Sequence, residues 1–176
     1  MKLTWFGGTT LRAYVGGEIV VVDAAGAPAR VDRGEVLAGA DHVLDSAASD
    51  APPRRDPATW RPPAPKNLMD APPPLEILRI ASGTLLIAAA GEPPLVLLGA
   101  GEPPRFGRWA DGAVIVLTSA RAAPVAEASV LLDVARPRLI ALAVDSERLD
   151  DIVAALAERL DGVGLVSLEP GLALEV

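Results

Sequence analysis

Five carboxylate side chains in this chain follow or flank short apolar runs that are typical of buried strands. They are Asp23, Asp45, Asp50, Glu102 and Asp145. If these runs belong to one system of sheets, several of the side chains should converge at one rim, where their oxygen atoms could hold Mg²⁺ or Ca²⁺. One of them could instead act as a general base. They could also only accept hydrogen bonds from loop N–H groups or face water, and the sequence leaves these alternatives open.

Two serines beside these carboxylates, Ser46 and Ser49, offer hydroxyl groups. A serine becomes a nucleophile when a neighbouring base removes its proton. The chain contains one histidine, His42, and neither a histidine nor a lysine is spaced to activate either serine. We therefore expect no hydroxyl nucleophile. Residues 99–102 are likewise not a phosphate loop, because the Gly-Lys-Ser/Thr ending is missing.

The composition predicts one globular domain. Apolar residues make up 51% of the 176 residues and aromatic residues only 3%, so the core must consist mainly of Val, Leu, Ile and Ala. The net charge of −7 repels phosphate backbones, so no nucleic-acid partner is expected. The absence of cysteine excludes disulfides and thiolate zinc ligands. Neither a signal peptide nor a membrane-spanning run is expected, which predicts a cytoplasmic protein without membrane contact.

Hydrophobic patterning predicts strands first, then alternating strands and helices. Expected strands cover residues 3–6, 11–15, 18–22, 42–44, 76–81, 85–89, 95–98, 113–117, 139–144, 163–168 and 172–176. The continuous run 19–22 favours a strand buried on both faces. Expected helices cover residues 34–40, 124–135 and 146–160, the last with Ser146 as its N-cap and a buried stripe of Ile152, Val153, Leu156 and Leu160. This order predicts an α/β fold with helices covering sheets.

A Pro-rich stretch at about residues 51–74 differs from the rest of the single domain that we expect over residues 1–176. Its proline clusters at 52–53, 62–65 and 72–74 are incompatible with a helix or a central strand. We predict a polyproline-like insertion that covers the body through Trp60, Leu68 and Met69. The alternative is a loop without function.

Several segments follow one another in a characteristic order. Met1–Gly7 is followed by a strand, by Gly16-Gly17 and by the apolar run that ends in Asp23; residues 137–142 and the closing Leu-Glu-Pro-Gly at 168–171 come later. Together they resemble the lactonase-like branch of the metallo-β-lactamase superfamily, over most of the chain except residues 51–74. The resemblance implies a four-layer αββα sandwich, here reduced in size. In that branch a histidine stands at the position of Gly8 and a proline at the position of Ala24.

The same resemblance implies that the metal site has been lost. The family motif Thr-His-x-His-x-Asp-His follows a short apolar strand, and zinc needs three or four nitrogen or oxygen ligands. Here the three histidine positions fall on Ser46, Ala48 and Ala51, and only Asp50 is retained. The distal histidine falls on Ala143, and Glu102 stands in place of a bridging aspartate. Replacement by such small residues predicts that the former site has closed.

We therefore predict a metal-free and non-catalytic member of this fold, without zinc hydrolase activity and without a cofactor. It would act as a binding or structural subunit, in a homo-oligomer or with a protein partner. One alternative is a metal-dependent hydrolase with a carboxylate-only site at Asp50 and Glu102. The other is a small-molecule binder that uses the vestigial pocket.

Overall fold

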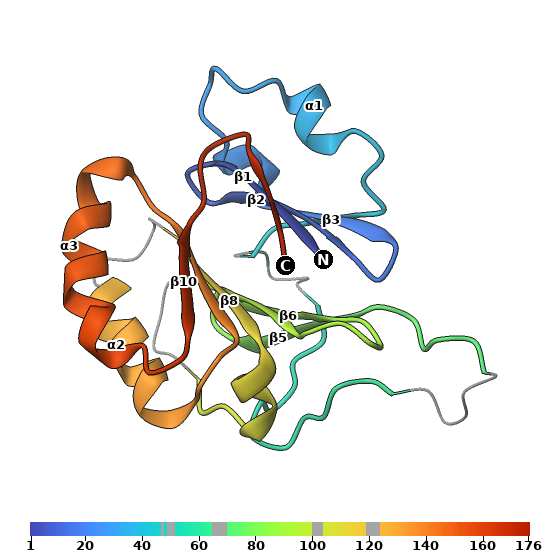
Figure 1. Ribbon diagram of the computed structural model, residues 1–176. Helices are drawn as coiled ribbons and strands as arrows, with labels where there is room; N and C mark the ends of the chain where they lie inside the picture. The colour runs from blue at the N-terminus through green and yellow to red at the C-terminus, as the bar shows by residue number, and fades with distance from the viewer. Residues whose placement is uncertain (47, 49–51, 65–69, 100–103, 119–123) are drawn as a thin grey trace.

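The computed structural model describes residues 1–46, 48, 52–64, 70–99, 104–118 and 124–176. Within these ranges the strands form two mixed β-sheets accompanied by a few helices, which confirms the α/β class (Figure 1). Six residues that carried predictions lie outside the described residues: Ser49, Asp50, Ala51, Leu68, Met69 and Glu102. No helix within the described ranges has both the length and the apolar content that a membrane crossing requires.

The N-terminal strands form the first sheet, in the order β11-β1-β2-β3-β4. Its members are β1 (Lys2–Gly7), β2 (Thr10–Val15), β3 (Glu18–Val22), β4 (His42–Leu44) and β11 (Ala173–Glu175). The hairpin between β2 and β3 turns on Gly16 and Gly17, whose φ angles of 61° and 88° require glycine-like freedom. Strand β4 pairs parallel to β3, so the ends of both strands reach the same edge of the sheet.

The second sheet has the order β10-β9-β8-β7-β6-β5. Its members are β5 (Glu76–Ala81), β6 (Thr84–Ala88), β7 (Leu95–Leu98), β8 (Val114–Thr118), β9 (Leu139–Ala143) and β10 (Gly164–Ser167). Strands β7 to β10 run parallel, and α2 (Pro124–Val134) and α3 (Ser146–Leu156) provide the crossovers on either side of β9. As predicted, Pro124 is the first residue of its helix, where a missing N–H costs nothing.

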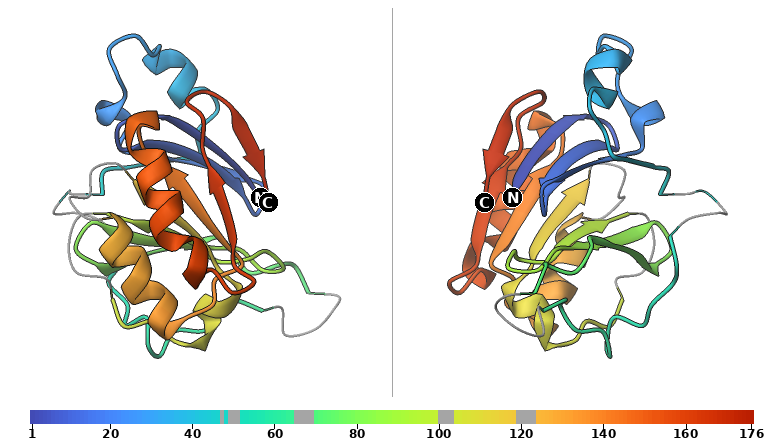
Figure 2. Two further views of the ribbon diagram at one scale, coloured as in Figure 1. Left: turned by 60° about the vertical axis from the view of Figure 1, so that its left-hand side comes forward. Right: turned by 90° about the vertical axis from the view of Figure 1, so that its right-hand side faces the viewer.

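The two sheets face one another across an apolar core. Leu3, Leu11 and Val20 of the first sheet pack against Leu85 and Leu95 of the second. Helices α2 and α3 cover the opposite face of the second sheet, as the left view of Figure 2 shows. The short helix α1 (Arg33–Leu37) lies over the outer face of the first sheet and buries Val36 there (Figure 1).

Strand β3 confirms the prediction of burial on both faces. Val20 and Val22 belong to the core between the sheets, whereas Val21 faces the cluster that contains Val36. Alternate residues of a strand point to opposite faces, so a strand covered on both sides needs an uninterrupted apolar run.

Helix α3 differs from its prediction in three ways. Asp145, with extended angles of φ −64° and ψ 144°, is the N-cap, so the assignment of Ser146 as cap was wrong. Val153 is 40% exposed, because it lies about 100° around the helix from the buried Ile152. The α-helix ends at Leu156 and continues as the 3-10 turn η3 (Ala157–Arg159).

The Pro-rich stretch packs against the body where it is described. Arg54 forms an isolated bridge with Arg79 on β5, which covers the edge of that strand. Trp60 is 8% exposed and meets Trp109 edge to face, with ring centroids 4.9 Å apart. The indole N–H of Trp109 donates to the carbonyl oxygen of Pro57 at 2.7 Å. The predicted packing through Trp60 is therefore confirmed.

Candidate functional site

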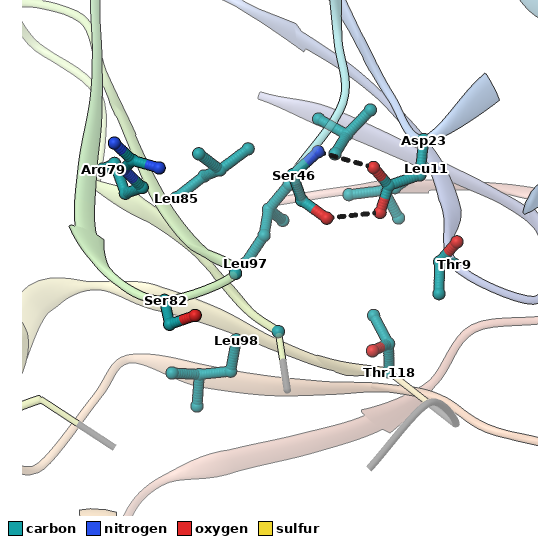
Figure 3. A pocket seen from close by; sticks show the side chains of 13 residues that line it. Thr9, Leu11, Asp23, Ser46, Arg79, Ser82, Leu85, Leu97, Leu98 and Thr118 are labelled. Carbon is teal, nitrogen blue, oxygen red and sulfur yellow. Dashed lines mark hydrogen bonds between the residues drawn. The ribbon is translucent and has the colours of Figure 1, made fainter. Parts of the chain in front are cut away.

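A pocket of about 300 Å³ opens between the two sheets at the carboxyl ends of β3, β7 and β8 (Figure 3). Ligands of α/β proteins bind preferentially outside the carboxyl ends of parallel strands. The described residues that line the pocket are Thr9, Leu11, Val22, Asp23, Ser46, Arg79, Ser82, Gly83, Leu85, Leu97, Leu98, Gly99 and Thr118.

Strand pairing explains the apolar walls of this pocket. Leu85 and Leu97 are partners in the pairing of β6 with β7, so their side chains stand next to one another. Leu11 and Val22 are partners in the pairing of β2 with β3 on the facing sheet. Each sheet thus supplies a pair of buried aliphatic side chains to the pocket wall.

Asp23 joins the end of β3 to the segment that follows β4. Its backbone has left-handed angles of φ 52° and ψ 46°. The hydroxyl of Thr10 holds it in place by donating to the Asp23 carbonyl oxygen at 2.6 Å. One carboxylate oxygen accepts the backbone N–H of Ser46 at 2.7 Å, and the other accepts the Ser46 hydroxyl at 2.7 Å. Both carboxylate oxygen atoms of Asp23 therefore accept hydrogen bonds from Ser46.

Replacing Ser46 by alanine is expected to lower the free energy of unfolding by roughly 1–2 kcal/mol, because a partly buried carboxylate loses a charge-assisted hydrogen bond. The backbone N–H of residue 46 should still hold Asp23 in place. Urea denaturation measures the change. Ser82→Ala serves as control, since Ser82 is exposed and its hydroxyl has no partner among the described residues. Equal stabilities of the two variants would contradict the role of the hydroxyl.

Four further polar side chains line the pocket and are labelled in Figure 3: Thr9, Arg79, Ser82 and Thr118. Arg79 lies on β5 opposite Leu85, and Thr118 ends β8. The sequence predictions did not include these residues. Arg79 could have been noticed in the sequence, because it is the charged residue within the apolar run from Ile77 to Ile80. Thr118 continues the alternation of the inward-facing Val114 and Val116.

The structure brings together part of the predicted site. Asp23 and Ser46 line the pocket, and Ala143 is the buried strand partner of Thr118 on β9. Asp45 is exposed, and its carbonyl oxygen accepts the N–H of Ala48 at 3.2 Å.

Asp145 lies apart from this group. It is exposed and lines a separate depression, together with Trp5 and Arg30. The alternative of a carboxylate-only metal site at Asp50 and Glu102 stays untested, because both residues lie outside the described residues. The same holds for Ala51.

The prediction that small side chains close the site stays a prediction, because Ala51, one of the three residues at the expected histidine positions, lies outside the described residues. Ser46, another of the three, lines the pocket of about 300 Å³.

The described residues do not fit a zinc site. Zinc needs three or four nitrogen, sulfur or oxygen donors that converge on one point. Among the residues that the structure describes, no group of three histidine, aspartate or glutamate side chains is placed to hold a metal ion. Asp23, the one carboxylate among the described residues of the lining, already accepts two hydrogen bonds from Ser46.

His42 also stands away from the pocket lining. Its Nε2 atom pairs with the Glu18 carboxylate at 2.6 Å across strands β3 and β4. The imidazole therefore supports the edge of the first sheet and does not activate the Ser46 hydroxyl.

Comparison with known proteins adds no assignment. No protein-family model matches this sequence, and no curated protein matches it.

Proposed function

We propose that this chain is a metal-free, non-catalytic binding protein that holds a small and mainly apolar organic molecule between its two sheets. The observation that carries the proposal is the pocket at the strand ends, with its aliphatic walls and few polar groups. This combination is what ligand-binding pockets of proteins generally have.

The aliphatic lining favours an apolar ligand. Leu11, Val22, Leu85 and Leu97 are buried in the core between the sheets and line this space. Each methylene group that a ligand buries there contributes about 0.8 kcal/mol to binding. The volume lies at the lower end of the range for ligand pockets, about 300–1,000 Å³, which favours a small molecule.

The polar groups favour binding over catalysis. The Ser46 hydroxyl donates to Asp23, and the imidazole of His42 is engaged by Glu18 on another part of the sheet. A serine nucleophile needs a base that can accept its proton and return it to the leaving group. The described lining of the pocket offers neither an imidazole nor an amine for this exchange.

We also propose that the fold is a reduced form of the four-layer metallo-β-lactamase-like sandwich. Two observations support this. Helices α2 and α3 cover one outer face of the paired sheets, and α1 lies over the other. Asp23, Ser46 and Thr118, the strand partner of Ala143, line one pocket. The resemblance implies that the family holds its metal at this position. In this proposal an organic ligand occupies the position at which the family holds its metal ions.

Calorimetry with 1-octanol, a neutral apolar probe, tests the proposed function. Saturable binding to the natural protein is expected. The variant Ser82→Trp places a bulky ring at the exposed rim of the pocket and should abolish that binding without a loss of stability. Leu172→Trp is the matched control, because Leu172 is 60% exposed and lies outside the pocket lining.

Elemental analysis of protein purified without chelator completes the test. The proposal expects no stoichiometric transition metal. A full equivalent of zinc, or binding of octanol that Ser82→Trp leaves unchanged, would contradict it. Absence of binding by the natural protein would contradict it as well.

A further inference from the structure

We infer that the ligand of this pocket carries a single carboxylate group, which pairs with Arg79 at the mouth while the apolar part lies against the leucines. This inference rests on the proposed function and names the chemical class of its ligand.

The strand pattern places the Arg79 side chain on the inner face of the second sheet. Leu78 and Ile80, its neighbours on β5, both belong to the core on the outer face. Alternation along the strand therefore directs Arg79 to the opposite side, toward the first sheet. Its partner on β6 is Leu85, whose partner on β7 is Leu97, so the arginine begins a row that continues with the pocket wall (Figure 3).

The backbone of Arg79 is fixed, whereas its guanidinium has no partner among the described residues. The N–H of Arg79 donates to the carbonyl oxygen of Pro53 at 3.1 Å, and its own carbonyl oxygen accepts the N–H of Arg55 at 3.0 Å. Other arginines of the chain have acceptors: Arg12 donates to the carbonyl oxygen of Glu35, and Arg159 pairs with Asp133.

The side chain of Arg79 is also half-buried, so it is partly withdrawn from water. A guanidinium carries five N–H donors, and withdrawing them without an acceptor is unfavourable. A ligand with suitable oxygen atoms would supply the missing acceptors.

The charge around the pocket favours a carboxylate over a phosphate. Arginine presents a planar pair of N–H groups that matches the two oxygen atoms of a carboxylate. Arg79 is the only cationic side chain among the described residues of the lining, which also contain the Asp23 carboxylate. One guanidinium balances one negative charge, and the net charge of −7 disfavours a dianion. The hydroxyls of Ser82 and Thr118 offer further donors at the same mouth.

Three probes of equal chain length separate the charge of the ligand from its apolar part: octanoate, 1-octanol and octylamine. Each is titrated by calorimetry into the natural protein and into Arg79→Met, which keeps an aliphatic side chain but removes the charge. Arg54→Met is the matched control, because Arg54 pairs with Arg79 through the backbone but is exposed and lies outside the lining. Arg79→Lys, which keeps the charge but loses the planar fork, serves as a second variant if Arg79→Met does not fold.

Octanoate is expected to bind most tightly and octylamine most weakly. Arg79→Met should weaken octanoate by about ten- to a hundredfold while octanol binding stays unchanged. Arg79→Lys should weaken octanoate less than Arg79→Met, and Arg54→Met should weaken neither probe. Equal affinity of the natural protein for octanoate and octanol would overturn the carboxylate but leave the proposed function intact. Loss of both probes in Arg79→Met would show only a structural role for Arg79, and failure of every probe to bind the natural protein would overturn both proposals.

Discussion

Replacing Gly99 by alanine is expected to destabilise the protein by more than about 3 kcal/mol. A β-carbon at this position would lie 1.7 Å from the carbonyl oxygen and 2.5 Å from the carbonyl carbon of Gly83. Both are backbone atoms of the turn between β5 and β6, so no flexible side chain can move aside. The turn would have to shift away from the end of β7, and both glycines line the pocket. Octanol binding should therefore fall together with stability.

Urea denaturation measures this effect against a matched glycine. A β-carbon at Gly112 would have no heavy atom within 4 Å, and Gly112 lies in the exposed part of the 3-10 turn η2 (Arg108–Gly112). Gly112→Ala should change the free energy of unfolding by no more than about 0.5 kcal/mol, or stabilise slightly by restricting the unfolded chain. If Gly99→Ala lowers the free energy of unfolding no more than Gly112→Ala does, Gly99 does not closely approach the backbone of Gly83.

Replacing Trp5 by alanine is expected to cost about 3–5 kcal/mol of the free energy of unfolding. Trp5 is 2% exposed and is the largest side chain of the core between the sheets. Its indole N–H donates to the carbonyl oxygen of Gly8 at 3.0 Å, and its own carbonyl oxygen accepts the N–H of Gly171 at 2.7 Å. Truncation would leave a cavity between the sheets and the acceptor of Gly8 without its donor.

Tyr14 provides the contrast to Trp5 from the same sheet. It lies on β2, next to β1, and is 50% exposed. Thermal or urea unfolding of Tyr14→Ala should show a loss below about 1 kcal/mol, because little buried area is removed. If the two variants lose similar stability, the core does not lie between the faces of the two sheets as described.

Most elements of the fold could be predicted from the sequence because their signals are local. The glycine pair after Val15 fixes a hairpin, and the uninterrupted run 19–22 requires cover on both faces. The pairing of β3 with β4 joins residues that are far apart in sequence, and no local pattern encodes it. The end of α3 was also missed, because the apolar stripe continues to Leu160 and does not distinguish the α-helix from the 3-10 turn η3 that follows it.

The candidate site was predictable only in part. Asp23 was singled out because it follows a buried strand, and Ser46 and Ala143 through the family resemblance; Asp23 and Ser46 line the pocket. Arg79 was missed because both faces of the second sheet are covered, so its strand lacks a clear polar and apolar alternation. Which face a residue of such a strand presents is decided by packing, here by the burial of Leu78 and Ile80 on the outer side.

The most direct test is the methyl NMR spectrum of the natural protein during a titration with octanoate. Binding between the sheets predicts saturable shifts of the methyl signals of Leu85, Leu97 and Thr118, whereas Leu172 stays unperturbed. Shifts confined to the surroundings of Asp145 and Leu149, which line the separate depression, would contradict it. So would a spectrum in which the pocket leucines do not respond at any octanoate concentration.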